Sequence, residues 1–184
     1  MLHEFHQGRA GSWSWLGSDP NRSPITLTLK GVTQVDRDPD WVFSELHRPE
    51  ALLNCVPGGN LTRLIAPGWF EARIAVGLGP FNFNYCGTGR ILESDPKKRT
   101  ASMTLQGKAA PQAPDIRIRM SMAVDAHPRG AEIQMSFRIA ISDRQGLLRR
   151  AWVDPIACDL LDRTIRRVKQ QLEDIPRASG PIAV

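Results

Sequence analysis

The chain has 184 residues, of which 41% are apolar and 23% charged, and it carries a formal net charge of +5. This length and balance are typical of one globular domain with a substantial core. No run approaches the ~18 apolar residues that span a bilayer, and the N-terminus lacks the basic segment and apolar core of a secretory signal. We therefore predict a cytoplasmic protein without a transmembrane segment.

The positive charge comes largely from arginines near the C-terminus. A nucleic-acid-binding surface would need these arginines on one face with aromatic side chains among them. Instead, Asp159 precedes Arg163 by four residues and Asp162 precedes Arg166 by four, so acids neutralise part of the basic run on a helix. The pattern predicts a solvated helix face and no nucleic-acid partner.

The chain offers no recognisable metal or redox motif. Cys55, Cys86 and Cys158 are an odd number, widely spaced, and form no Cys-x-x-Cys pair. Each is expected to behave as a small buried hydrophobic residue in a reducing compartment. Because no nucleophile motif, phosphate loop or metal-spaced cluster appears either, we predict no metal site and no cofactor.

The first 23 residues differ from the rest of the sequence. Glycine, serine and proline interrupt any periodicity there, which predicts a flexible N-terminal extension over residues 1–23. The regular pattern begins near Pro24, so we expect one folded domain over residues 24–175. A short C-terminal tail is expected over residues 176–184.

Two short helices are predicted after the first strand. Asp38-Pro39 resembles an N-cap followed by proline at the first helical position, and Pro49 opens the second helix. Pro57-Gly58-Gly59 ends it. Helices this short are unstable alone and must dock on the sheet. The residues expected to face inward are Trp41, Val42, Phe43, Leu46, Leu52, Leu53 and Val56.

Alternating apolar and polar residues predict a series of strands, each with one buried face. Asp95-Pro96-Lys97-Lys98 and His127-Pro128-Arg129-Gly130 are expected turns between them. Gly77, Gly79 and Pro80 predict a bend or bulge within the sheet rather than an interruption. The alternating runs cover residues 25–29, 70–78, 81–85, 101–105, 116–124 and 133–141.

The last predicted element is an amphipathic helix. Asp154-Pro155 again resembles a cap followed by proline at the first position, with residues 147–152 as a preceding turn. Apolar residues recur at steps of three and four. They are Val153, Ile156, Ala157, Leu160, Leu161, Ile165, Val168 and Leu172.

The order is therefore strand, two short helices, antiparallel meander and long helix. One sheet face and one helix face must bury each other. We predict an α+β fold of the helix-grip type, in which a curved antiparallel sheet wraps around the long C-terminal helix and leaves room for an apolar ligand.

Several residues in this order resemble a known family. Within the START and polyketide-cyclase-like (SRPBCC) helix-grip superfamily, the chain is similar to the G-subunit family of carbon monoxide dehydrogenase. Arg48 stands where that family usually has Asp. The matching residues are Val42-Phe43, Leu46, Pro49-Glu50, Leu52, Cys55, Pro57-Gly58, Gly79-Pro80, Gly87 and Asp95.

The resemblance implies an apolar cavity and an association with molybdenum hydroxylases of the carbon monoxide dehydrogenase type. It also implies quinone or lipid binding and membrane recruitment for some members, which carry an apolar C-terminal tail. This sequence ends with Ile182-Ala183-Val184 and shows no such tail, so we expect no stable membrane anchor. The family motif supplies no established catalytic group, and none is assigned.

The candidate ligand-binding residues come from the apolar strand faces and the final helix. Methionine suits a surface that accepts variable apolar shapes, although ordinary core filling gives the same pattern. Tyr85 is either a group that orients a ligand carbonyl or a core tyrosine. The candidates are Ile74, Val76, Phe81, Phe83, Tyr85, Met103, Met120, Met122, Met135, Phe137, Leu161 and Ile165.

Three functions fit this sequence. The first is a non-enzymatic carrier of a hydrophobic small molecule, for example a quinone. The second is an enzyme of the cyclase or dehydratase kind that uses Tyr85 or a buried acid. The third is a module that helps assemble an oxidoreductase. An enzyme should show polar groups that converge in the cavity. A carrier should show apolar cavity walls, and an assembly factor should show an exposed apolar patch.

Overall fold

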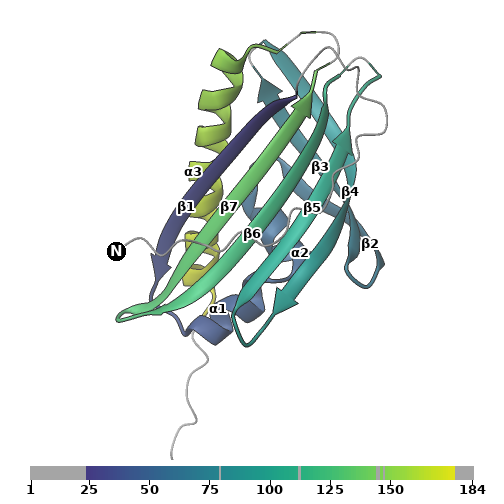
Figure 1. The fold of residues 1–184 in the computed structure, drawn as a ribbon. Coiled ribbons are helices and arrows are strands. Elements are labelled where there is room, and N and C mark those ends of the chain that lie inside the picture. The colour runs from purple at the N-terminus through teal and green to yellow at the C-terminus, as the bar shows by residue number, and fades with distance from the viewer. Residues whose placement is uncertain (1–23, 79, 112, 144–145, 147, 177–184) are drawn as a thin grey trace, which may run out of the picture.

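The computed structural model describes residues 24–78, 80–111, 113–143, 146 and 148–176. The predicted extension over residues 1–23, and the predicted tail beyond Pro176, lie outside the described residues. Figure 1 shows a sheet that curves around one long helix, with two short helices at one end of the sheet. The elements are β1 (Ile25–Val35), α1 (Pro39–Leu46), α2 (Pro49–Cys55), β2 (Gly59–Ala66), β3 (Trp69–Leu78), β4 (Phe81–Asp95), β5 (Thr100–Lys108), β6 (Asp115–His127), β7 (Gly130–Ser142) and α3 (Arg150–Asp174).

The sheet has seven strands in the order β1-β7-β6-β5-β4-β3-β2, and every neighbouring pair is antiparallel. Strands β2 to β7 form a meander, and β1 joins its far edge by pairing with β7 (Figure 1). The apolar face of this sheet turns toward α3, and the two bury each other. This confirms the predicted helix-grip architecture.

The first short helix begins as its sequence predicts. The Asp38 side chain accepts hydrogen bonds from the backbone N–H groups of Asp40 (3.0 Å) and Trp41 (2.9 Å). Pro39 occupies the first turn, where a missing N–H costs nothing. Val42, Phe43 and Leu46 are buried, so the helix docks through one face.

The turn after the second short helix contains a glycine that the backbone requires. Leu52 and Leu53 of α2 are buried, as predicted. Gly58 has φ of +74°, and a Cβ built on it would lie 2.5 Å from the carbonyl oxygen of Ala75. Only glycine fits both this conformation and this contact. The turn therefore leads the chain directly from α2 into the edge of the sheet.

That edge strand, β2, was not predicted. Its residues do not alternate between buried and exposed, and Leu64 and Ile65 are both exposed. A strand with no buried face lacks the alternation from which strands are recognised. In addition, the β2–β3 register shifts between Leu61 and Arg63 and again between Leu64 and Ala66, which breaks the period further.

The bend or bulge predicted at Gly77, Gly79 and Pro80 is wrong for the described residues on either side of Gly79, which itself lies outside them. The chain reverses there, because Leu78 of β3 pairs with Phe81 of β4 and the two strands continue as an antiparallel hairpin. A glycine and proline pair allows either geometry, and alternation on both sides does not distinguish them. The predicted turns are confirmed at Asp95, whose side chain accepts from the backbone N–H groups of Lys97 and Lys98, and at residues 127–130.

The predicted start of the long helix is also wrong. Helix α3 begins at Arg150, after the N-cap Arg149, and Pro155 lies inside it. The proline leaves the carbonyl of Ala151 without an N–H partner in the helix. Since Ala151 is exposed, water can donate a hydrogen bond to that carbonyl oxygen. Val153, two residues before the proline, is buried. The free energy gained by burying its side chain favours extending the helix to residues before Pro155.

The predicted burial of the three cysteines is confirmed for Cys55 alone. Cys86 and Cys158 are exposed. Cys86 follows the buried Tyr85 on β4, and alternation places it on the opposite face. Cys158 follows the buried Ala157 on α3 and projects away from the sheet. The helical arginines are exposed as predicted, and Arg163 pairs with Asp159.

Candidate functional site

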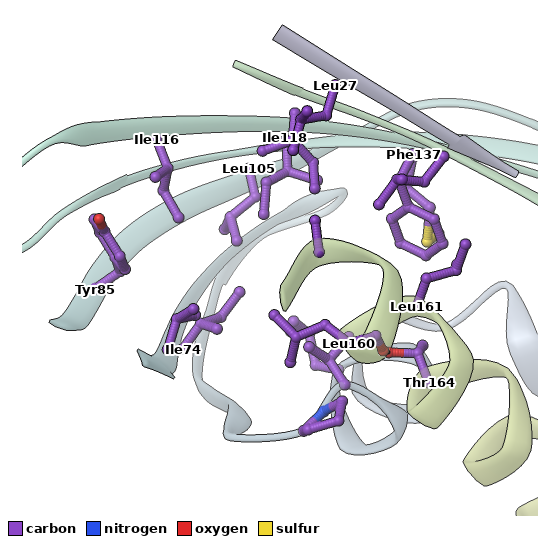
Figure 2. A pocket seen from close by; sticks show the side chains of 18 of the residues that line it. Leu27, Ile74, Tyr85, Leu105, Ile116, Ile118, Phe137, Leu160, Leu161 and Thr164 are labelled. Atoms are coloured by element: carbon purple, nitrogen blue, oxygen red, sulfur yellow. The ribbon is translucent and has the colours of Figure 1, made fainter. Parts of the chain in front are cut away.

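A cavity of about 150 Å³ lies between the concave face of the sheet and α3. Its walls come from β1, from strands β3 to β7, from α2 with the turn after it, and from the N-terminal half of α3. Figure 2 shows side chains from the sheet on one side facing those of Leu160 and Leu161 on the other. The sheet curves around α3, and the side chains of the two elements do not fill the whole space between them.

Most of the candidate ligand-binding residues line this cavity. They share the sheet parity that faces α3, or the helix face that faces the sheet. Met103 on β5 and Met120 on β6 are register partners, so two flexible side chains stand next to each other on the wall. The candidates on the wall are Ile74, Val76, Tyr85, Met103, Met120, Met135, Phe137 and Leu161.

Two aromatic candidates do not line it. Phe81 and Phe83 share the parity of Tyr85, but they lie closer to the β3–β4 turn and are only half-buried. The rings follow one another along β4, with centroids 6.0 Å apart for Phe81 and Phe83 and 5.8 Å for Phe83 and Tyr85. Of the three, only Tyr85 reaches the cavity.

Met122 and Ile165 also lie outside the cavity wall. Met122 is 2% exposed and belongs to the packed core shared with α1 and the C-terminal half of α3. Ile165 faces β1, where a Cβ on Gly31 would lie 1.8 Å from its Cδ1 atom. On β6, Met120 lines the cavity and Met122 on the same face does not. On α3, Leu161 lines it and Ile165 does not.

The wall also includes residues that were not predicted. Leu27 and Leu29 of β1, and Leu52, Leu53 and Val56 at α2, all contribute to it. The alternation of β1 could have revealed the first two, since it has the same period as the other strands. The sequence did not indicate that α2 covers the cavity, because a helix face shows only that it is buried and not against what.

Tyr85 supplies one of the few polar atoms in this wall. The residue is 2% exposed, and its hydroxyl has no hydrogen-bond partner among the residues that the structure describes. Burial raises the pKa of Tyr85 to about 12, and the carboxylates of Asp115 and Asp143 act in the same direction. The phenol therefore stays protonated at neutral pH, and its hydroxyl is an unused donor that neighbouring atoms cover almost completely.

Thr164 supplies the other side-chain hydroxyl. It is 4% exposed, and its Oγ1 donates to the carbonyl oxygen of Leu160 at 2.7 Å. Figure 2 shows Tyr85 at one end of the lining and Thr164 near the other. The Thr164 donor is already used within α3 and lies far along the lining from Tyr85. The two hydroxyls therefore do not donate to the same ligand atom.

No charged side chain belongs to the described wall of the cavity. Within the same described residues, no group of three or more His, Cys, Asp or Glu side chains could hold a metal ion. The arrangement can exclude water and enclose an apolar molecule. It does not bring together an acid and a base.

A second feature lies on the surface, at the β2–β3 hairpin. Leu64, Ile65 and Trp69 are 57%, 47% and 42% exposed, and the Arg90 guanidinium lies 5.0 Å from the centre of the Trp69 ring. A hollow next to Pro49 and Ile91 runs along the same hairpin. Three large apolar side chains at one tip are more than scattered exposure accounts for.

Figure 1 shows the hairpin at the opposite edge of the sheet from β1. We call this surface the hairpin tip and define it by Leu64, Ile65 and Trp69. In the described part of the chain, no helix is long and apolar enough to cross a membrane.

Solved structures with this architecture come from several bacteria. A conserved protein from Geobacillus kaustophilus is 13% identical with a TM-score of 0.67, over 80% of this chain and 95% of that one. A protein from Rhizobium leguminosarum has a TM-score of 0.60 at 13% identity, over 82% and 97%. The Zhui aromatase/cyclase from Streptomyces sp. R1128 has a TM-score of 0.59 at 13% identity, over 85% and 99%. At these identities the likeness concerns the fold alone.

No curated protein matches the sequence. The pattern of one protein family does match, over residues 31–173. This range begins within β1 and runs to the last residues of α3, so it includes the sheet, both short helices and the whole cavity wall except Leu27 and Leu29. The chain belongs to the carbon monoxide dehydrogenase G-subunit (CoxG) family, within the helix-grip superfamily.

Proposed function

We propose that the protein binds a hydrophobic small molecule, such as a quinone or a lipid, in the cavity between the sheet and α3, and that it acts as a carrier. The observation that carries this proposal is the wall itself. It is apolar throughout except for the hydroxyls of Tyr85 and Thr164. An apolar cavity of this kind gains free energy from an apolar guest, whereas water inside it would lack hydrogen-bond partners.

The size of the cavity favours a guest with a small rigid part. An apolar cavity of about 150 Å³ takes a molecule the size of benzene. Met103, Met120 and Met135 all line the wall. Methionine has three rotatable bonds and adapts its shape readily, so these side chains can move to admit a larger ring or an attached chain.

A cyclase or dehydratase reaction is the alternative within the same cavity. Such chemistry needs a group that accepts a proton and another that donates one near the reacting atoms. In the described wall, the only available hydroxyl is that of Tyr85, since Thr164 is bonded to Leu160. We therefore favour carriage over catalysis.

The test is direct binding of an apolar probe. A fluorescent apolar dye should bind with saturation at one site per chain, and 1,4-naphthoquinone should displace it. The native, folded protein is used, and the denatured chain is the control for non-specific adsorption. An absence of saturable dye binding would overturn the proposal.

We further propose that the protein serves a molybdenum hydroxylase of the carbon monoxide dehydrogenase type. The family to which the chain belongs supports this, as does the exposed hairpin tip of Leu64, Ile65 and Trp69. Exposed apolar patches mark surfaces that contact proteins, membranes or ligands, and we assign this one to the hydroxylase because of the family.

The partner test compares two surfaces. Full-length protein is mixed with the purified hydroxylase of the same organism and separated by size. Leu64→Ser with Trp69→Ser should abolish co-elution. Val32→Ser is the matched control, because Val32 is 57% exposed and lies at the other edge of the sheet. Co-elution that survives the double substitution would overturn the assignment of this surface.

A further inference from the structure

We propose that the cavity selects neutral ligands that carry a hydrogen-bond acceptor, such as a ketone or quinone carbonyl, over carboxylates of the same shape, and that the Tyr85 hydroxyl holds the acceptor. This inference rests on the proposed binding of an apolar molecule. It adds the chemical class of the polar end and the end of the cavity at which that polar end lies.

The first step concerns the Tyr85 hydroxyl. It is buried and has no partner among the described residues. A buried polar group without a hydrogen bond costs free energy, and that cost is recovered when an acceptor arrives. A ligand carbonyl that displaces the side chains covering this hydroxyl would meet a donor that nothing else in the described structure uses.

The second step concerns charge. Asp115 opens β6 and Asp143 follows β7, and both act electrostatically on the Tyr85 phenol. Their negative charges make this end of the cavity unfavourable for an anion. No lysine, arginine or histidine lines the described wall, so a buried carboxylate would have no cation to pair with.

The third step concerns orientation. In Figure 2 the Tyr85 hydroxyl stands at one end of the lining beside Ile116, while Phe137, Leu161 and Thr164 stand toward the other end. The Thr164 hydroxyl is bonded within α3. A ligand with one polar end would therefore place that end at Tyr85 and extend its apolar body between the sheet and α3.

The test uses three ligands of nearly equal shape. 2-Acetylnaphthalene is a neutral ketone, 2-naphthoate is the corresponding carboxylate and is ionised at about pH 7, and 2-ethylnaphthalene has no polar group. Dissociation constants are measured by displacement of the apolar dye from the full-length protein. The ketone should bind at least about tenfold more tightly than the carboxylate.

The variant Tyr85→Phe removes the hydroxyl and keeps the ring. It should weaken binding of the ketone roughly threefold to tenfold and leave binding of the hydrocarbon unchanged. Ser102→Ala is the matched control. Ser102 is also buried with an unpartnered hydroxyl, but it does not line the cavity, so all three dissociation constants should stay the same.

Folding of each variant is checked by its thermal midpoint, which should not fall in Tyr85→Phe because no hydrogen bond of the free protein is lost. Equal ketone binding by wild type and Tyr85→Phe, or carboxylate binding as tight as ketone binding, would overturn this inference while hydrocarbon binding still supports the carrier. If none of the three ligands binds, both proposals fall.

Discussion

The ring of Phe70 on β3 lies directly over Gly89 on β4. The two residues are register partners, and a Cβ built on Gly89 would lie 2.1 Å from the Cζ atom of Phe70. Phe70 is 1% exposed and lines the cavity. Gly89 has no side chain, and this leaves the space in which the ring of Phe70, a residue of the cavity wall, packs against the backbone of β4.

Gly89→Ala should destabilise the protein by about 1–3 kcal/mol, because the new methyl group must displace a buried ring. Urea denaturation measures the change in the free energy of unfolding. Gly77→Ala is the control: Gly77 is exposed on β3, and its added Cβ would approach only the side chain of Asn82, at 3.1 Å. Equal stability of the two variants would contradict the packing described at Phe70.

Met120 and Met122 share one face of β6 but differ in surroundings. Both belong to the buried core, but Met120 also lines the cavity and Met122 does not. Met120→Trp should cost less than about 1 kcal/mol while weakening dye binding at least about tenfold, since the larger side chain fills open space. Met122→Trp should cost about 1–3 kcal/mol, because that position offers no room.

The paired measurement is the thermal midpoint together with the dissociation constant of the dye. The prediction fails if both tryptophan variants lose stability equally. That outcome would mean that the side chains around Met120 close on one another as tightly as those around Met122.

The pH dependence of stability should carry a contribution from Tyr85. Its pKa in the folded protein is raised to about 12 from an ordinary value of 10.0. Above about pH 10 the unfolded chain releases this proton while the folded protein keeps it. The contribution of Tyr85 is therefore complete below about pH 10 and is lost as the pH rises toward about 12.

Thermal midpoints measured across this range for wild type and Tyr85→Phe isolate the effect from other groups. The wild type should lose more stability between about pH 10 and about pH 12 than the variant does. Tyr85 is the sole tyrosine in the sequence, so ultraviolet absorbance of tyrosinate reports its titration directly. A midpoint near the ordinary value in the folded protein would contradict the burial of the hydroxyl.

The three cysteines should react at different rates. Burial raises the pKa of the Cys55 thiol to about 11, which the charge of Arg167 partly offsets, and its Sγ lies within 3.2 Å of the Ala51 carbonyl oxygen. Since the thiolate is the reactive form, a maleimide should label exposed Cys86 and Cys158 in the native protein and reach Cys55 only after unfolding. Mass spectrometry of the peptides measures this, and native labelling of Cys55 would contradict it.

Alternation made most of the sheet predictable. In β6, Ile116, Met120, Met122 and Val124 are buried while the residues of the other parity are half-buried or exposed, so sequence and structure share one period. The helix starts at Asp38 and Pro49 are equally clear in the sequence, because the Asp38 side chain caps the first helix and the fixed φ of proline suits the first position of the second. These features depend on neighbours in sequence.

The position of the cavity depends on neighbours in space. Met120 and Met122 have the same residue type and parity, yet only Met120 meets open space. That difference comes from where α1 packs on β6 and where α2 and α3 pack on other parts of the sheet, which no periodicity records. The same holds for β2, whose exposed Leu64 and Ile65 show no alternation because neither faces the core.

Pro155 has a consequence for the timing of exchange with solvent. It removes one backbone bond near the start of α3, where the remaining bonds include those from the Trp152 and Val153 N–H groups to Arg149. Local fluctuations that open this first turn therefore break fewer bonds than those that open the rest of the helix. Val153 lines the cavity, so we expect the fraying of this helical turn, rather than unfolding of the domain, to set the rate at which a proposed guest enters or leaves.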